Sequence, residues 1–243
     1  MWFQFGDVHS SELNLKVLHI QKPILPEFQD QRETMPGIDG TVLYPQSFES
    51  KQIEIECLLL HANQKAKYVE NRQLAKLYSQ YEQKLITSDE PDVFYLGKLS
   101  GNFTPDSHKT LSSLTFSFTC QPFAYSLNKK VMSYTKSSAD IFMVTSNGTA
   151  YSEFKLTLTP QETIENVSIS VGDVVLTYEA KIEAGKSLVV DTEEFEAYLN
   201  DENVTLNLSG EFPVIYPGEN AVQITANNDF HYDATFEFYD RFM

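Results

Sequence analysis

Histidines are the side chains of this sequence best suited to acid–base catalysis and metal binding, and they are dispersed along the chain. The five are His9, His19, His61, His108 and His231. Their separations do not match the ligand spacing of a metal site. The sequence also lacks a G-x-S-x-G turn, a P-loop, an H-E-x-x-H helix, a C-x-x-C pair and an EF-hand loop. We therefore expect no catalytic residue, no cofactor and no metal ion, and a protein that is not an enzyme.

Carboxylates are abundant, and one run of them has the composition of a site for a hard cation. Residues 191–196 read DTEEFE, and Ca²⁺ prefers carboxylate oxygens as ligands. The simpler interpretation is a solvated loop on an acidic domain. Glycosidase chemistry needs two carboxylates at a set separation across a cleft. With 34 acidic residues in the chain, candidate pairs are too numerous to identify such a site.

The two cysteines lie in strongly alternating segments. Cys57 and Cys120 each occupy an apolar position of such a segment, which predicts two buried, reduced thiols. A disulfide would require their Cα atoms to lie within about 7 Å. The sequence does not determine that distance, so the redox state of the pair stays open.

Length and charge narrow the classes of function. A chain of 243 residues is long enough to form two domains. Residues 1–137 hold 14 basic and 15 acidic side chains, whereas residues 138–243 hold 4 and 19. Phosphate binding needs the opposite sign, so we expect no nucleic acid. No apolar segment approaches a membrane span and no secretory signal is visible at the start, so we expect no membrane insertion and no secretion.

The first half predicts a sheet with one helix on it. Alternating apolar residues predict strands at residues 13–20, 53–59, 93–99 and 114–120, with Pro122 ending the last. A helix at about residues 64–86, with Asn63 as N-cap, is predicted from one apolar stripe. That stripe consists of Leu74, Leu77, Tyr78, Tyr81 and Leu85. Between the first two strands, Gln21–Thr41 contains three prolines and two glycines and predicts a long loop with some extended structure.

The second half predicts strands throughout. Ala124–Ser138 is polar and lacks a sustained period, which indicates a linker and two domains, 1–135 and 138–243. Beyond it, short alternating segments are separated by turn residues, with hairpin signals at Asn147-Gly148 and Gly172-Asp173. Val204, Leu206 and Leu208 predict a strand, Pro217-Gly218 a turn, and Val222, Ile224 and Ala226 a further strand. This pattern is typical of a β-sandwich or jelly roll.

Several sequence segments, in order, resemble the distal tail protein (Dit) family of siphophages. The main one is LSGEFPVIYPGENAVQI, residues 208–224. Others are DEPDVFY at 89–95, CQPF at 120–123, NGT at 147–149, LVVD at 188–191 and a G-x-D-G-like turn at 37–40. The resemblance covers the whole chain. It implies a mainly β protein with an α+β N-terminal domain and a C-terminal galectin-like β-sandwich.

The same resemblance implies a structural role. A Dit protein is expected to form a homo-oligomeric ring, commonly a hexamer, at the distal end of the tail. This hub would join the major tail tube protein to a tail-associated lysin, baseplate or receptor-binding protein. The protein would reside at the virion tail tip after synthesis in the host bacterial cytoplasm. The alternative is a carbohydrate-binding module that contacts host cell-wall saccharide, since galectin-type sandwiches bind sugars on aromatic side chains.

We expect the contact surface between copies of the chain in the ring to lie in the Pro-rich loop, Gln21–Thr41, and on the polar edges of the first sheet. The length of this loop and the near-neutral charge of the first half motivate this hypothesis. The candidate interface residues are Pro26, Phe28, Arg32, Met35, Ile38 and Asp39.

Overall fold

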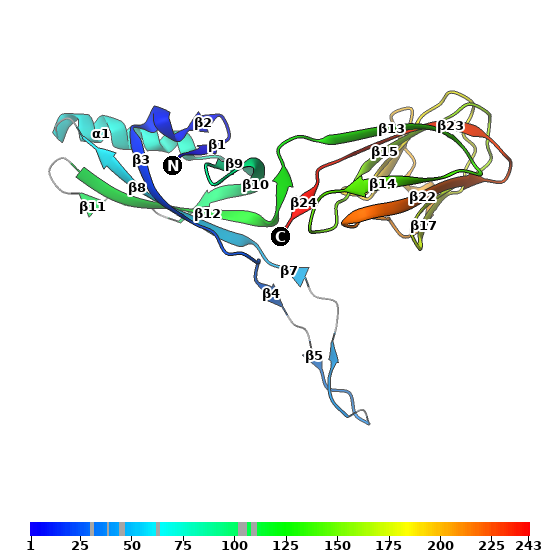
Figure 1. Ribbon diagram of the computed structural model, residues 1–243, viewed down its shortest axis with the longest axis horizontal. Helices are drawn as coiled ribbons and strands as arrows, with labels where there is room; N and C mark the ends of the chain where they lie inside the picture. Colours follow the sequence, from blue (N-terminus) through cyan, green and yellow to red (C-terminus); the bar gives the residue numbers. More distant parts are fainter. Residues whose placement is uncertain (30–31, 38, 44–46, 62–63, 102–105, 108–110) are drawn as a thin grey trace. The chain divides into compact units, whose positions relative to one another are not determined.

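The computed structural model describes residues 1–29, 32–37, 39–43, 47–61, 64–101, 106–107 and 111–243, and it divides into two compact units (Figure 1). Unit 1 comprises Met1–Leu127 with Met243, and unit 2 comprises Asn128–Phe242. Strands dominate both, so the predicted mainly β fold is confirmed. Within the described residues, no helix is long and apolar enough to cross a membrane.

Unit 1 is built on one antiparallel sheet with the strand order β2-β1-β9-β10-β12-β8-β3, and β11 also pairs with β12. These elements are β1 (Phe3–Phe5), β2 (Val8–His9), η1 (Ser10–Leu13), β3 (Leu15–Gln21), β8 (Lys51–Leu60), α1 (Gln64–Gln73), η2 (Leu74–Leu77), β9 (Gln83–Thr87), β10 (Glu90–Ser100), β11 (Asp106–Ser107) and β12 (Leu111–Ser126). The pairing of β8 with β12 is regular from Leu60↔Leu111 to Lys51↔Cys120.

The strong alternation in β8 and β12 places one face of each strand in the core. Ile53, Ile55, Cys57 and Leu59 are completely buried, and Phe116 and Phe118 meet them from β12. Both cysteines are buried free thiols, as predicted. Burial of the uncharged thiols raises the pKa of each to about 12.

The predicted helix at residues 64–86 is wrong over its second half. The α-helix ends at Gln73, a 3-10 turn follows, and residues 83–87 form β9. Leu74 and Leu77 are buried as expected, but Tyr78 and Tyr81 are exposed. Leu85 is buried because it is a strand residue between Phe5 of β1 and Tyr95 of β10. The predicted N-cap, Asn63, lies outside the described residues.

Two predictions at the end of the first half also need correction. Pro122 does not end a strand, because β12 continues to Ser126. Pairing of β12 with β8 stops at Cys120, and the ladder with β10 is irregular at this point, so no hydrogen bond from residue 122 is needed. The expected linker at 124–138 is the end of β12 followed by β13 (Lys130–Ser137), which belongs to unit 2. The predicted boundary near residue 135 therefore falls inside a strand.

Unit 2 is a two-sheet β-sandwich. One sheet has the order β13-β23-β15-β18-β19-β20 and the other β14-β22-β16-β17-β21. Inward side chains of both sheets form one core, with Leu156, Ile169, Ile224 and Phe236 almost fully buried. The remaining elements are β14 (Ile141–Ser146), β15 (Lys155–Pro160), β16 (Val167–Val171), β17 (Val174–Tyr178), β18 (Leu188–Asp191), β19 (Glu196–Leu199), β20 (Glu202–Asn203), η3 (Thr205–Asn207), β21 (Leu208–Gly210), β22 (Gly218–Ala226), β23 (His231–Phe238) and β24 (Arg241–Phe242).

Local turn signals in unit 2 succeeded where a hairpin forms and failed elsewhere. Gly172 joins β16 to β17 with φ +58°, as the predicted hairpin requires. Gly218 has the positive φ of +91° expected for the second residue of a Pro-Gly turn, but it begins β22, and no hairpin joins β21 to β22 because β21 pairs with β17. Asn147-Gly148 is not a hairpin, since β14 pairs with β22. An added Cβ at Gly148 would lie 2.3 Å from the main-chain oxygen of Arg241. This glycine therefore permits close approach of two backbone segments.

The strand predicted at residues 204–208 is also wrong. Thr205–Asn207 form the 3-10 turn η3, and Leu206 is 100% exposed. The amide of Asn207 donates to the carbonyl of Val204 at 2.9 Å. The main-chain amide of Ala197 donates to the Thr205 hydroxyl at 2.9 Å. A side-chain oxygen of this turn, and not the main chain of a neighbouring strand, therefore accepts the Ala197 amide.

Candidate assembly surface

A two-stranded arm interrupts unit 1 between β3 and β8. It is paired at two levels: β4 (Phe28–Gln29) with β7 (Ser47–Phe48), and β5 (Arg32–Glu33) with β6 (Val42–Leu43). Figure 1 shows these strands leading away from the sheet of unit 1. The segment predicted as a long loop is thus one side of this arm, and later residues supply the other side.

The arm exposes apolar side chains to an unusual extent. Ile24 is 89% exposed, Leu25 55%, Phe28 51% and Met35 38%. Such side chains gain free energy when a partner removes them from water, about 25 cal/mol per Å² of apolar area. A series of them on one extended segment is typical of a protein–protein contact.

The structure places the sequence-predicted interface residues along the arm without gathering them into a pocket. Phe28, Arg32, Met35 and Asp39 are exposed, whereas Pro26 is buried within the chain. Ile38 lies outside the described residues. The sequence reasoning missed Ile24 and Leu25, although an Ile-Leu pair between two prolines in a polar loop is itself an unusual pattern.

The base of the arm is held to the sheet by specific contacts. The main-chain amide of Glu49 donates to the carbonyl of Glu27 at 2.7 Å. The ring of Phe48 packs edge-on against Phe123 of β12, with centroids 5.5 Å apart. Phe28 is the cross-strand partner of Phe48. The first level of the arm is therefore anchored to the core of unit 1.

Charged residues cluster beside this anchor. Lys22 forms ion pairs with Asp89, at 2.7 Å, and with Glu90. The Tyr95 hydroxyl donates to Glu90 at 2.9 Å. Partial burial alone would raise the pKa of Asp89, but hydrogen bonds from Lys22 and Thr87 lower it below its ordinary value. Burial, helped by the hydrogen bond to Glu90, raises the pKa of Tyr95.

One trio in unit 1 has the geometry of a catalytic triad. His61 contacts Glu70 through Nδ1 at 2.6 Å and the Ser112 hydroxyl through Nε2 at 2.7 Å. Ser112 is completely buried, however, so a substrate has no route to its oxygen. Glu70 lies on α1, whereas His61 directly follows the last residue of β8 and Ser112 is the second residue of β12. The trio therefore clamps α1 onto the sheet, a role that sequence spacing did not reveal.

The acidic run at residues 191–196 and the exposed aromatic residues of unit 2 were the other candidates for a binding site. Asp191 accepts the main-chain amides of Glu193 and Glu194 at 3.1 and 3.3 Å, so the acidic run turns around its own first residue. Among the described residues, no group of three His, Cys, Asp or Glu side chains could hold a metal ion. His108 lies outside that set. Tyr151, Phe195 and Tyr216 are exposed aromatic residues of unit 2, and sugar binding there stays a prediction.

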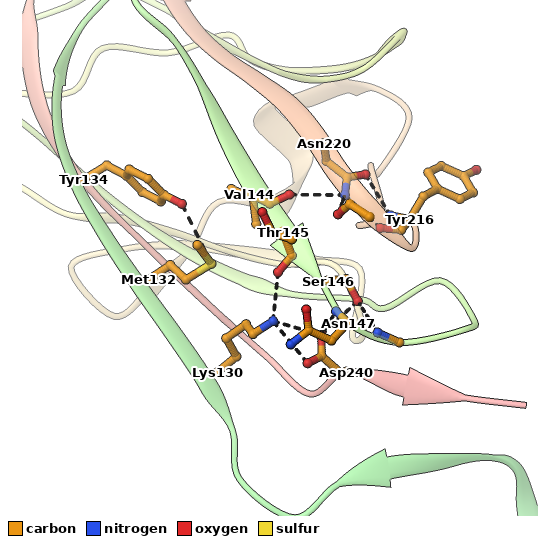
Figure 2. Close-up of polar contacts among 12 residues, drawn as sticks. Lys130, Met132, Tyr134, Val144, Thr145, Ser146, Asn147, Tyr216, Asn220 and Asp240 are labelled. Atoms are coloured by element: carbon orange, nitrogen blue, oxygen red, sulfur yellow. Dashed lines mark hydrogen bonds and ion pairs between the residues drawn. The ribbon is translucent and has the colours of Figure 1, made fainter.

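Two buried polar groups shape one end of the sandwich in unit 2 (Figure 2). Asp240 accepts from the Ser146 hydroxyl at 2.8 Å and the Asn147 amide at 3.0 Å, and Lys130 pairs with it at 3.1 Å. The Asn220 side chain donates to the carbonyls of Val144, Tyr216 and Gly218 and accepts the main-chain amide of Tyr216. The Tyr216 ring itself is exposed.

Comparison with known proteins decides the family. The model of the phage tail protein RIFT-related domain matches residues 9–120. The model of the siphovirus-type tail component, C-terminal domain, matches residues 147–242. The chain belongs to the distal tail (Dit) family of siphophages. The protein is therefore a structural component of a phage tail, as the ordered sequence segments predicted.

One solved structure agrees with that assignment at the level of the fold. The chain is similar to the crystal structure of the Dit protein of phage SPP1, with 14% identity over 100% of this chain and 99% of that chain and a TM-score of 0.76. That protein is described as a hub of the adsorption apparatus in phages that infect Gram-positive bacteria. Two phage P2 baseplate structures match with 8% and 9% identity over 96% of this chain and 97% of theirs, at a TM-score of 0.46. No curated protein sequence matches the chain.

Proposed function

We propose that this Dit protein forms a ring-shaped hub at the distal end of a siphophage tail. The hub joins the tail tube to tail-associated, baseplate or receptor-binding proteins and does so by geometry, without an active site. The observation that carries the proposal is the anchored arm with its exposed apolar side chains, in a chain of the Dit family. A head-to-tail contact repeated between copies closes a ring when its rotation divides the circle.

Charge supports the assignment of this contact to unit 1. Residues 1–127 carry 11 basic and 15 acidic side chains, a net charge of −4, so copies of unit 1 repel one another weakly. Residues 128–242 carry 7 basic and 19 acidic side chains, a net charge of −12, which disfavours packing of unit 2 against copies of itself and favours an exposed position. In this account the arm of one copy covers apolar surface of the next.

Variants of the arm test this account. Ile24→Glu combined with Phe28→Glu places charge at two exposed apolar positions without disturbing the buried core. Leu206→Glu combined with Val131→Glu is the matched control, because both residues are exposed apolar side chains of unit 2. Sedimentation velocity should show a multimer of about six copies for wild type and control, and a single copy for the arm variant. An arm variant that associates as wild type does would overturn the assignment of the contact to the arm.

The proposed partners are tested by reconstitution. The tail tube protein and the tail-associated protein of the parent phage are mixed separately with the purified chain. We expect each to co-sediment with the multimer and not with the single-copy arm variant, because a ring presents many equivalent sites at once. Equal binding by the single copy would show that ring formation is not what recruits these partners.

A further inference from the structure

A head-to-tail contact joins two different surfaces of the same chain, so the arm needs a receiving surface on the next copy. In the single chain Ile24, Leu25 and Phe28 of the arm are exposed, so their own copy does not cover them. Elsewhere in unit 1, four large apolar side chains are exposed within residues 68–81, which comprise the end of α1, η2 and the start of the loop that leads to β9. They are Tyr68 (64%), Val69 (55%), Tyr78 (76%) and Tyr81 (73%).

One side of the α1–η2 segment faces its own unit. Glu70, Leu74 and Leu77 are spaced at i, i+4 and i+7, which places them on one helix face. Leu74 and Leu77 are buried. Glu70 contacts Nδ1 of His61 at 2.6 Å. The acidic side chain of this helix is therefore engaged within its own copy.

The other side of the segment combines apolar and basic side chains. Arg72 follows Val69 by three positions and Tyr68 by four, so these three residues share a helix face. Arg72 is exposed, and so is Lys76, four positions further on. Tyrosine and arginine are the residue types enriched at the centres of protein–protein contacts. We call this exposed side the α1–η2 surface, which consists of Tyr68, Val69, Arg72, Lys76, Tyr78 and Tyr81.

The arm and the segment that carries the α1–η2 surface have opposite net charges. Residues 64–81 contain four basic side chains and one acidic side chain, a net charge of +3 in a chain whose net charge is −16. Residues 23–50, the arm, contain one basic and five acidic side chains, a net charge of −4. Glu27, Glu33 and Asp39 are exposed carboxylates of the arm. Opposite potentials of this kind attract and orient two surfaces.

We propose that the α1–η2 surface of each copy receives the arm of the neighbouring copy. The inference rests on the proposed ring and names both sides of its repeated contact. Apolar side chains of the arm cover Tyr68 and Val69, which removes apolar area of both copies from water. Carboxylates of the arm lie against Arg72 and Lys76, which sets the direction in which the arm binds.

Reversal of charge on each side tests this pairing in the full-length chain. The reversed-helix variant carries Arg72→Glu and Lys76→Glu. The reversed-arm variant carries Glu27→Lys, Glu33→Lys and Asp39→Lys. All five side chains are exposed, so the substitutions leave the core of unit 1 unchanged.

A matched control reverses the charge of two exposed lysines outside both segments, with Lys98→Glu and Lys181→Glu. Sedimentation velocity over a range of concentrations gives the association constant, and thermal unfolding of dilute samples checks that each variant is folded. We expect each reversal alone to weaken association about tenfold or more, because like charges then face each other. A chain that carries both reversals should recover most of this loss, because opposite charges face each other again. The control should associate as wild type does.

The outcomes separate this inference from the ring itself. If the reversed-helix variant associates as wild type does, while Ile24→Glu with Phe28→Glu gives single copies, the arm makes the contact and the α1–η2 surface does not receive it. If both reversals weaken association and their combination recovers nothing, the two segments do not face each other. A wild-type chain that stays single at every concentration would remove the ring and this contact together.

Discussion

Replacing Asn220 by aspartate is a sharp test of how the Y-P-G-E-N turn is held. Asn220 is buried, and its Oδ1 accepts the main-chain amide of Tyr216 at 2.9 Å. Its Nδ2 donates to the carbonyls of Val144, Tyr216 and Gly218 at 3.2, 2.8 and 3.1 Å (Figure 2). Three carbonyls on one side and one amide on the other determine which end of the side chain is nitrogen.

Asn220→Asp keeps the shape of this side chain and replaces the donor Nδ2 with an oxygen that can only accept hydrogen bonds. The introduced carboxylate still accepts from Tyr216, but its second oxygen faces three carbonyl oxygens that have lost their donor. Each lost hydrogen bond costs about 0.5–1.5 kcal/mol. An uncompensated buried charge costs about 3–5 kcal/mol. Because the two terms overlap, we expect unit 2 to lose about 3–5 kcal/mol of unfolding free energy at pH 7.

The pH dependence separates the charge from the shape. Carbonyl oxygens around the introduced carboxyl raise its pKa above the unfolded value of about 3.9. The folded state then binds more protons than the unfolded state, so the deficit relative to wild type shrinks as pH falls through the raised pKa. Urea unfolding of wild type, Asn220→Asp and Asn220→Ala between pH 4 and pH 8 measures this. An aspartate variant as stable as wild type at pH 7, or a deficit that does not change with pH, would refute the reasoning.

Three further predictions concern close packing and buried polar groups. Gly148→Ala should lower the unfolding free energy of unit 2, measured in urea, by about 1–3 kcal/mol, because the new Cβ meets a main-chain oxygen at the start of β24 2.3 Å away; an unchanged unfolding free energy would contradict it. Cys57 and Cys120 have pKa values raised from 9.0 to about 12. The two uncharged thiols therefore contribute their full share of the unfolding free energy below pH 9, and this contribution is lost as pH rises toward 12. A Cys57→Ala, Cys120→Ala variant should lose unfolding free energy less steeply than wild type between pH 9 and pH 12. Equal losses in the two proteins over this range would contradict the prediction. Ser112→Ala leaves the buried Nε2 of His61 without its partner and should cost about 1–3 kcal/mol in urea unfolding, whereas a loss within error would mean that the clamp contributes little.

Strand alternation in the long segments was enough to predict much of the fold. In β8 and β12 every second residue is apolar over many positions, so a single register satisfies the pattern and burial follows it. The stripe from Leu74 to Leu85 was ambiguous because two buried leucines, two tyrosines and a strand leucine happen to share a helical period. Tyrosine tolerates exposure, and pairing with β1 and β10 decided the conformation of residues 83–87.

The sequence also predicted only part of the candidate assembly surface. The length of the Pro-rich segment and the near-neutral charge of the first half predicted an interface there, and exposed Phe28 and Met35 lie in this segment. The second side of the arm and the contacts at its base depend on how β3, β8 and β10 are arranged in space. The ion pairs of Lys22 with Asp89 and Glu90 join residues that are 67 and 68 positions apart in the sequence. Such contacts arise from sheet register, which local sequence patterns do not encode.

Light scattering on the purified full-length chain, at two concentrations and two salt strengths, is the most direct test of the ring. The account predicts a species near six times the chain mass of 27.7 kDa that persists on dilution. It should also persist at the higher salt, because apolar contacts of the arm are not screened by ions. A mass of one chain under all four conditions would contradict the account.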